Sequence, residues 1–223
     1  MVAWRLLIAD VGNTLPRCIL DYSASLLTWR LLQTTITNAD ELKKLILAKS
    51  IDTIINFASQ THVYKSFGDS LYFTHNNVFG THVLLEACRK VAGQIKKFIH
   101  ISTDEVYGET KRDVASIEIS RFEPTNPFVA TKAATMHMAL TRCPAAFDAI
   151  VHKGEVGKEC KIGADTENSD MDHQQIFDTD INTSFNFVYY RPFNNKRYLI
   201  DSTRLKDLDW EETTPFFEGL NGK

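Results

Sequence analysis

The sequence has few glycines in its first part and no long hydrophobic segment. Gly12 is the only glycine before Gly68, so neither GxGxxG nor GxxGxxG, the patterns that bind a dinucleotide pyrophosphate, can be written there. No apolar run approaches the ~18–20 residues that cross a bilayer. The apolar stretch within residues 1–10 is too short for a signal peptide. We therefore expect a cytoplasmic protein without a membrane segment.

No charge sign dominates, and the usual metal-binding patterns are missing. The 25 basic and 28 acidic residues leave a net charge of -3, which gives no reason to expect a nucleic-acid partner. Four cysteines form no CxxC pair and seven histidines form no HExxH motif, so we expect reduced thiols and no metal. With 43% hydrophobic and 24% charged residues, the composition is that of a globular protein.

Strands and helices alternate along the first 142 residues. Buried strands are predicted at residues 6–9, 53–58 and 97–102, and helices at residues 38–49, 70–92 and from Pro127 onwards. Asn38 and Asn126 are the expected N-caps of the first and third helices, and Gly93 is the expected stop of the second. This alternation predicts an α/β fold with a parallel sheet covered on both faces.

The pattern becomes shorter and more polar after residue 141. Strands are predicted at residues 185–190 and 197–200, and Ser202 is expected to cap a short helix that runs to Leu208. Residues 164–183 are polar and weakly periodic, which indicates a loop. The net charge changes from positive to negative near residue 140, and we place a change of module there.

The first candidate for chemistry is the segment 102–108, which directly follows a predicted parallel strand. Ligands of open α/β sheets bind at the carboxyl ends of the strands. Adjacent Asp104 and Glu105 at such a place could act as an acid and a base. The competing interpretation is a solvated turn that Asp104 caps.

Two further segments follow the same logic. Phe128 and Lys132 lie four residues apart and so share one face of the third helix, although such a lysine is usually a solvated surface residue. Residues 57–63 follow another buried strand, where small side chains allow a ligand to approach the backbone. His62 within this segment is more often a structural residue than a catalyst.

These segments, in this order, carry a resemblance to a known family. The matching text comprises residues 51–63, 77–88, 98–109 (FIHISTDEVYGE), 124–133, 152–156 and 191–198. The chain resembles the nucleotide-sugar 4,6-dehydratases of the extended short-chain dehydrogenase/reductase superfamily, above all the dehydratase domain of plant-type UDP-rhamnose synthases. The dTDP-glucose 4,6-dehydratases come next.

The resemblance implies a Rossmann-like, doubly wound parallel sheet with a small, truncated C-terminal substrate-binding part. Residues 1–142 would form an NAD(P)-binding domain with an atypical N-terminus, and residues 143–223 a remnant of the nucleotide-sugar-binding domain. The cofactor would be NAD and the substrate UDP-glucose or dTDP-glucose, on the way to rhamnose.

The resemblance also implies roles for individual residues. Asp104 would be the acid that protonates the leaving C6 hydroxyl, Glu105 the base that removes the C5 proton, and Thr103 a hydrogen-bond partner of the C4 oxygen. Lys132 would hold the ribose of NAD. The other positions match cofactor-binding residues, Phe57, Ala58, Ser59 and Asn77, or nucleotide-binding residues, Arg191 and Asn194.

Three departures from the family's pattern point to impaired catalysis. Phe128 occupies the position of the catalytic tyrosine, so the base for C4 oxidation is missing. The Gly-rich loop is also missing, which predicts weak or absent NAD binding. Only about a dozen residues, near 139–148, stand where the family carries a long stretch that shapes the sugar pocket.

Several hypotheses therefore remain open. The chain could be a pseudoenzyme, a working 4,6-dehydratase despite its changes, or a non-catalytic partner of an intact homologue. The resemblance implies a homodimer or such a mixed dimer, formed through helices 70–92 and 127–140, where Leu71, Val78, Leu85, Phe128 and Met136 could serve core or interface. A kinase of the actin-like fold is the hypothesis from another class, suggested by Asp10 to Thr14.

Overall fold

A computed structural model describes residues 6–9, 35–110, 114–142, 159–162 and 199–210. Several sequence predictions lie outside these residues: the motif from Asp10 to Thr14, the loop at 164–183, the strand at 185–190, the first half of the strand at 197–200, Arg191 and Asn194.

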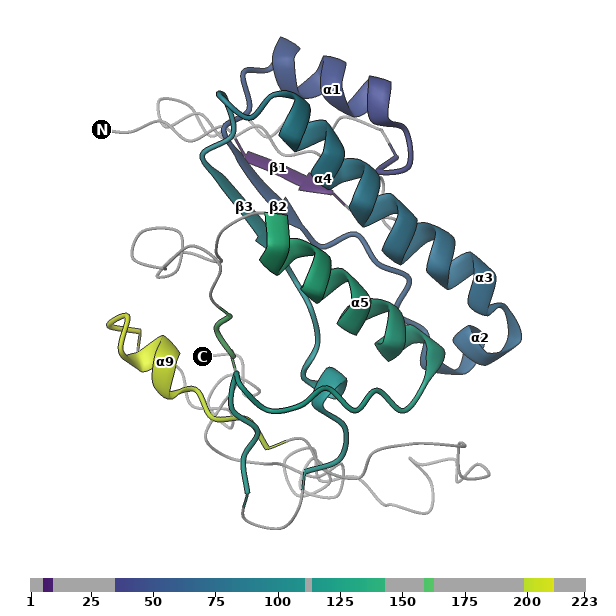
Figure 1. Ribbon diagram of the computed structural model, residues 1–223, viewed down its shortest axis with the longest axis vertical. Coiled ribbons are helices and arrows are strands. Elements are labelled where there is room, and N and C mark those ends of the chain that lie inside the picture. The colour runs from purple at the N-terminus through teal and green to yellow at the C-terminus, as the bar shows by residue number, and fades with distance from the viewer. Residues whose placement is uncertain (1–5, 10–34, 111–113, 143–158, 163–198, 211–223) are drawn as a thin grey trace, which may run out of the picture.

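Three parallel strands form the sheet, as the sequence predicted (Figure 1). They are β1 (Leu6–Ala9), β2 (Thr53–Asn56) and β3 (Lys97–His100), in the order β1-β2-β3. Parallel neighbours require a crossover connection, which the helices between them supply. Ile54 and Ile55 point to opposite faces of the sheet, and both are buried. The expectation of a strand buried on both faces is therefore confirmed for β2.

Two helices pack against each other and against the sheet to form the main core (Figure 1). They are α1 (Ala39–Ala48) and α4 (Gly80–Lys90). The N-cap of α1 is Asn38, whose Oδ1 accepts a hydrogen bond from Glu41 N at 3.2 Å, as predicted. The buried apolar side chains of this core include Ile36, Leu42, Ile46, Ile54, Leu84, Leu85, Cys88 and Phe98.

The helix predicted at residues 70–92 is a composite rod. It comprises α3 (Ser70–Phe73), a π-helical stretch η1 (Thr74–Phe79) and α4. It ends at Lys90, before the predicted stop at Gly93, because Val91 leaves helical geometry as the C-cap. A short helix α2 (Val63–Gly68) precedes it. The sequence pattern did not predict α2, because its N-cap residue, His62, makes no side-chain cap hydrogen bond that a local pattern could indicate.

The helix α5 (Pro127–Arg142) begins where the sequence placed it. Asn126 Oδ1 accepts a hydrogen bond from Val129 N at 2.9 Å, and Pro127 occupies the first turn, where its missing N–H is no loss. The first half of α5 packs in a second apolar cluster with Phe73, Val106 and Tyr107.

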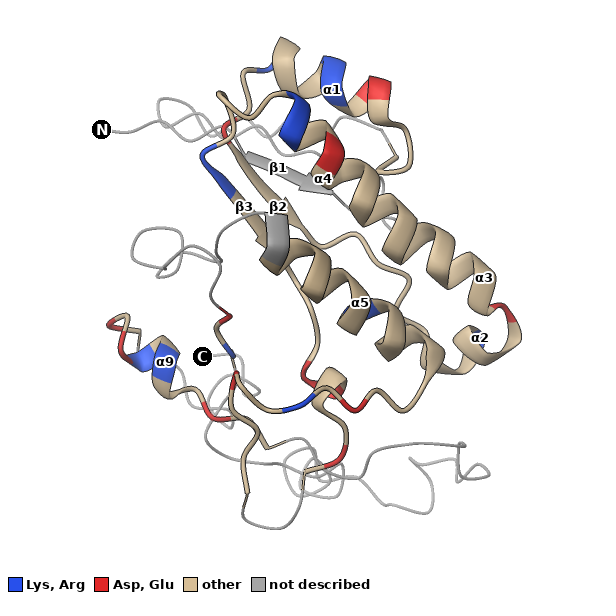
Figure 2. Cartoon of the chain, viewed as in Figure 1, with Lys and Arg blue, Asp and Glu red and all other residues tan. Residues whose placement is uncertain are grey.

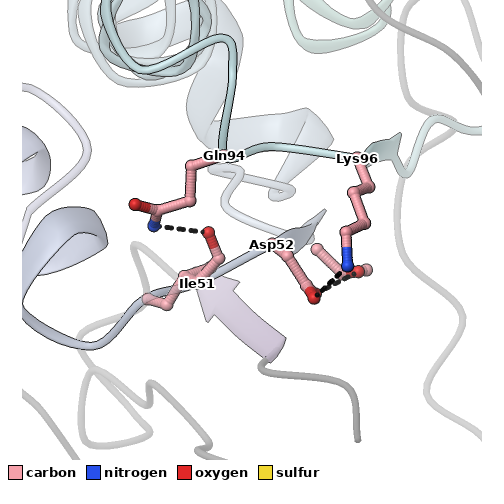
Figure 3. A network of polar contacts seen from close by, with 5 residues as sticks. Ile51, Asp52, Gln94 and Lys96 are labelled. Atoms are coloured by element: carbon pink, nitrogen blue, oxygen red, sulfur yellow. Dashed lines mark hydrogen bonds and ion pairs between the residues drawn. The ribbon is translucent and has the colours of Figure 1, made fainter. Parts of the chain in front are cut away.

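The amino ends of β2 and β3 are tied together by polar contacts (Figure 3). Gln94 Nε2 donates to the carbonyl of Ile51 at 2.8 Å, and Lys96 Nζ lies 3.3 Å from Asp52 Oδ2. These contacts link the two strands at the end of the sheet opposite to their carboxyl ends. The carboxyl ends, where open parallel sheets bind ligands, are not involved in them.

Near the C-terminus the structure describes residues 199–210. Ile200 forms a parallel bridge with Ser116, and a short helix α9 (Thr203–Lys206) follows. The prediction that the Ser202 side chain caps this helix is wrong: Asp201 Oδ1 accepts the hydrogen bond from Thr203 N at 2.7 Å, and the helix ends before Leu208. Within the described residues no helix is long and apolar enough to cross a membrane.

The two helix caps give a matched test of the fold. Asn126→Ala leaves the amide of Val129, a fully buried residue, without its acceptor, so we expect a loss of about 2 kcal/mol in the free energy of unfolding. Asn38→Ala at the exposed cap of α1 should cost less, about 1 kcal/mol. Urea unfolding measures both, and a larger loss for Asn38→Ala would contradict this ranking.

Candidate functional site

The carboxyl ends of β2 and β3 lead into two neighbouring segments, residues 57–62 and 101–108, that lie beside the first half of α5 (Figure 1). Ligands of open parallel sheets bind at this edge. In Figure 2 acidic residues follow β3, whereas Lys132 is the only basic residue among the described side chains of α5. The edge therefore brings together the segments that the sequence singled out.

Asp104 and Glu105 begin a short 3-10 helix, η2 (Asp104–Tyr107). Thr103 is its N-cap: the hydroxyl accepts a hydrogen bond from Glu105 N at 3.3 Å and donates to Asp104 Oδ1 at 3.2 Å. The interpretation that Asp104 caps a solvated turn is thus wrong, because Thr103 provides the cap. Both carboxyl groups are half-buried, and we call residues 103–108 the acid–base turn.

Gly108 ends the acid–base turn with a backbone conformation that only glycine adopts easily. Its φ is 76° and its ψ is -162°. A Cβ atom at this position would also lie 2.9 Å from the carbonyl oxygen of Glu123. The turn therefore has a fixed end.

Lys132 is buried, although a lysine at this position is usually solvated. Only 4% of its surface is exposed, and its Nζ donates a hydrogen bond to the carbonyl of Ile101 at the end of β3. Burial lowers the pKa of Lys132 to about 8. Its ammonium group lies where β3 runs into the acid–base turn.

Phe128 lies one helical turn before Lys132 and is also buried. Its ring packs edge-to-face against Phe73, with 6.5 Å between the centroids. Phe128 and Leu85 therefore belong to the core, and the interface role considered for them is not needed. Of the other positions considered for an interface, Leu71 is 80% exposed.

Asn77 joins three elements through one carboxamide group. Its Oδ1 accepts from Gln60 N at 2.7 Å, and its Nδ2 donates to Gln60 O at 3.0 Å and to Thr131 Oγ1 at 2.8 Å. The residue lies in η1, where an extra residue per turn alters which side chains face inward. Asn77 thus holds the segment after β2 against α5.

A second buried amide network was missed by the sequence analysis. Asn56 Oδ1 accepts from Ala58 N at 3.1 Å, and Asn56 Nδ2 lies 3.2 Å from His100 Nδ1. Because Asn56 donates to Nδ1, the proton of His100 is on Nε2, which faces Thr135 Oγ1 at 3.0 Å. Burial and the charge of Lys132 lower the pKa of His100 to about 3, so the ring is neutral. A polar residue at the end of each buried strand was the available signal.

The remaining candidate positions of the first segment line the same edge. Phe57 is 40% exposed, Ala58 is buried and Ser59 is half-buried. A cavity of about 830 Å³ begins at Ser59 and extends along α2 and α3 between Tyr64 and Tyr72. Ser102 Oγ, just after β3, is buried and makes no hydrogen bond to any described residue.

No group of three or more His, Cys, Asp or Glu side chains that could hold a metal occurs among the described residues. Cys88 and Cys160 form no disulfide bond with each other, while Cys18 and Cys143 lie outside the described ranges.

Comparison with known proteins identifies relatives of this chain. The GDP-mannose 4,6 dehydratase family matches residues 23–143. A trifunctional UDP-glucose 4,6-dehydratase/UDP-4-keto-6-deoxy-D-glucose 3,5-epimerase/UDP-4-keto-L-rhamnose-reductase of Arabidopsis thaliana is 39% identical over 248 residues, covering 83% of this chain and 37% of that protein. A dTDP-D-glucose 4,6-dehydratase of Dictyostelium discoideum is 27% identical, covering 87% of this chain and 68% of that protein. The chain thus spans less than two fifths of the Arabidopsis proteins that it matches.

Solved structures agree on the fold. The dTDP-glucose 4,6-dehydratase DesIV from Streptomyces venezuelae, solved with NAD bound, has a TM-score of 0.76 at 21% identity and covers 88% of this chain and 79% of that one. The dTDP-glucose 4,6-dehydratase from Bacillus anthracis, in complex with NAD, has a TM-score of 0.70 at 22% identity and covers 85% and 76%. The Rossmann-type α/β fold is therefore confirmed.

The buried ammonium of Lys132 predicts a pH-dependent stability. The folded pKa of about 8 lies below the ~10.4 of an unfolded lysine, so the unfolded chain binds more protons between these values and stability from this group rises with pH. Lys132→Met removes the penalty, which amounts to at most about 3 kcal/mol below pH 8. We expect urea unfolding to show that the advantage of Lys132→Met over the natural chain shrinks from pH 8 to pH 10. Parallel profiles would contradict the burial of a charged amine.

Asn77 and its neighbour Asn76 form a matched pair for a second test. Asn77→Ala removes three hydrogen bonds of a buried side chain, two of them to the backbone of Gln60, and should cost roughly 3 kcal/mol or more in unfolding free energy. Asn76→Ala removes a single hydrogen bond, from Nδ2 to the Tyr72 carbonyl at 2.8 Å near the surface, and should cost about 1 kcal/mol. Equal losses would show that Asn77 does not tie the segment to α5.

Proposed function

The chain belongs to the nucleotide-sugar 4,6-dehydratase family of extended short-chain dehydrogenases/reductases, and on this basis we propose that it is a dehydratase-like protein with an impaired catalytic site. The observation that carries the proposal is the buried Lys132, which reaches the end of β3 one turn after a phenylalanine. The scaffold around the reaction is kept, and the group that would start the reaction is replaced.

The acid–base turn supports the dehydration half of the reaction. Glu105 would take the proton from the sugar C5, and Asp104 would give a proton to the C6 oxygen as water leaves. Thr103, which fixes the start of the turn through its hydroxyl, would face the C4 oxygen. Adjacent carboxyl groups in one rigid turn suit two proton transfers at neighbouring carbons.

The residues at the strand ends fit an NAD molecule on its nicotinamide-ribose side. The ammonium group of Lys132, held at the carbonyl of Ile101, would turn toward the ribose hydroxyls, and the buried Ser102 Oγ, which has no hydrogen-bond partner among the described residues, would gain one. Phe57, Ala58 and Ser59 would lie along the cofactor, with Asn77 holding that segment from below. NAD held there would supply the acceptor for the hydride of the sugar C4 and the donor of hydride to C6.

The oxidation half of the reaction lacks its base. A phenyl ring at position 128 takes no proton, and the loss of a general base typically costs ~10²–10⁴ in rate. Tyr107 does not replace it, because its hydroxyl donates to Glu159 Oε2 at 2.8 Å and its pKa is raised by burial and by Glu159. The C4 hydroxyl would thus keep its proton.

The sheet topology, the domain division and the sugar nucleotide in this proposal rest on the resemblance to the relatives. The sheet would be doubly wound, with residues 1–142 as the NAD(P)-binding domain and 143–223 as a truncated nucleotide-sugar-binding part that includes Arg191 and Asn194. UDP-glucose or dTDP-glucose would be the sugar nucleotide, since dehydratases of both occur among the relatives.

A non-catalytic partner of an intact homologue is the second candidate function. Leu71 is 80% exposed and Phe79, stacked on His75 with 5.2 Å between the ring centroids, is 49% exposed. These side chains on α3 and η1 would form an interface in a homodimer or a mixed dimer. Light scattering at micromolar concentration tests this, and a monomer both alone and with an intact dehydratase would exclude it.

We predict weak NAD binding. The sequence before Gly68 provides no glycine turn whose amides could hold the pyrophosphate, so affinity would rest on the nicotinamide-ribose side alone. Calorimetric titration of the pure chain should give no dissociation constant at or below the low micromolar range. A tighter constant would show that another segment binds the pyrophosphate.

The variant Phe128→Tyr tests the proposed block. It restores a phenol one turn before Lys132, whose positive charge favours the phenolate. We expect little turnover of UDP-glucose or dTDP-glucose to the 4-keto-6-deoxy sugar from this change alone, and much more when the missing segment near residues 139–148 is grafted from an intact relative. Phe79→Tyr, on the exposed face of η1, is the control.

Substantial product from the natural chain, equal to that of Phe128→Tyr, would show that position 128 is no block. The expected ranking is no turnover for the natural chain and Phe79→Tyr, a trace for Phe128→Tyr, and the most for Phe128→Tyr with the graft.

A further inference from the structure

The segment 159–162 holds the ring of Tyr107, the last residue of η2, from two directions. The Tyr107 hydroxyl donates to Glu159 Oε2 at 2.8 Å, and Lys161 Nζ lies 3.6 Å from the centroid of the ring. Phe122 packs against the ring edge-on, with 5.2 Å between the centroids. Tyr107 is therefore fixed at its hydroxyl, its face and its edge.

Lys161 is buried in an unusual way. The residue is 7% exposed, and its Nζ makes no hydrogen bond to any described residue. Its Nζ instead lies over the aromatic face of Tyr107, and a cation in this position is attracted to the ring. Burial lowers the pKa of Lys161 to about 8, against the opposing influence of the facing carboxylates Glu118, Glu159, Asp201 and Asp104.

Neighbouring elements anchor this segment in turn. Lys161 N donates to Glu118 Oε1 at 3.3 Å, and an Nη of Arg204 in α9 donates to the carbonyl of Glu159 at 2.9 Å. Residues 159–162 are therefore held between residues 114–118 and α9, and their contacts with Tyr107 restrict the motion of its ring.

The order of the acid–base turn depends on how firmly Tyr107, the last residue of η2, is packed. Its backbone hydrogen bonds from Val106 N to Thr103 O and from Gly108 N to Glu105 O are 3.4 Å and 3.0 Å long, and the Thr103 hydroxyl adds two bonds at its start. Short 3-10 segments have poor hydrogen-bond geometry and gain most of their order from packing. The Asp104 carboxyl is also close enough to Lys161 for the two charges to interact.

We propose that Lys161 and Glu159 are positioning residues for Asp104 and Glu105, acting through the ring and hydroxyl of Tyr107. The part of the chain after residue 143 then does more than bind a nucleotide, because it fixes the geometry of the acid–base turn. This inference rests on the proposed function in that it takes Asp104 and Glu105 as the reacting pair.

Amide hydrogen exchange followed by NMR tests the positioning without cofactor or substrate. In Lys161→Met, which keeps the length of the side chain and removes its charge, we expect the amides of Val106 and Gly108 to exchange on the order of tenfold faster. Lys161→Arg keeps the cation over the ring and should restore slow exchange. The amides of β2 and β3 should not change in either variant.

The interaction between the charges of Asp104 and Lys161 gives a measurement that a purely packing role of Lys161 would not change. Titration of the Lys161 amine, observed by NMR of its Nζ, should show a lower pKa in Asp104→Asn than in the natural chain, because the carboxylate that favours the ammonium is gone. Ala substitution of Glu109, an exposed acidic residue beyond the turn, is the control.

Tyr107→Phe, which loses only the hydroxyl, keeps the test decisive if Lys161→Met fails to fold. Faster exchange of Val106 and Gly108 in this variant supports the proposal. Unchanged exchange in Lys161→Met and Tyr107→Phe, or an unchanged Lys161 titration in Asp104→Asn, overturns it. Tight NAD binding by the natural chain, or turnover of sugar nucleotide equal to that of Phe128→Tyr, would refute the proposed function and would leave these exchange and titration results standing.

Discussion

The site depends on how one carboxamide satisfies the backbone at the end of β2. A chain that leaves a buried strand exposes N–H and C=O groups that cannot reach the next strand, and each unsatisfied group costs about 1–3 kcal/mol. Asn77 accepts from Gln60 N and donates to Gln60 O, and it also reaches Thr131 in α5. The segment after β2, the rod α3–η1–α4 and α5 are therefore held in one arrangement, which in turn sets where Lys132 can reach.

The framework of the site is separate from the position at which we propose that the chemistry is blocked. The contacts that shape the site, among them Asn56 with His100 and Lys132 with Ile101, are made between protein groups. Phe128 packs edge-to-face against Phe73 in the buried cluster beside them. A change of the reactive group at position 128 therefore need not alter the contacts that shape the site.

Local signals in the sequence predicted much of the fold. Strand residues 6–9, the caps Asn38 and Asn126, and the parallel pairing of β2 with β3 all follow from patterns within a few residues. The strand β2 ends earlier than predicted, because the side chain of Asn56 accepts the hydrogen bond of the Ala58 amide. The π-helical turn at Asn77 and the approach of Lys161 to Tyr107 depend on residues far apart in the chain, which no local pattern encodes.

The most direct test of this account measures the exchange rate of the Gln60 backbone amide in the natural chain. If Asn77 fixes the segment after β2, this amide should exchange as slowly as the Ile101 amide, which extends the ladder to Asn56 O at 3.1 Å. Both would then open only when the α/β unit unfolds. Exchange of Gln60 at the rate of an exposed loop, with Ile101 still protected, would show that the segment is not held by Asn77.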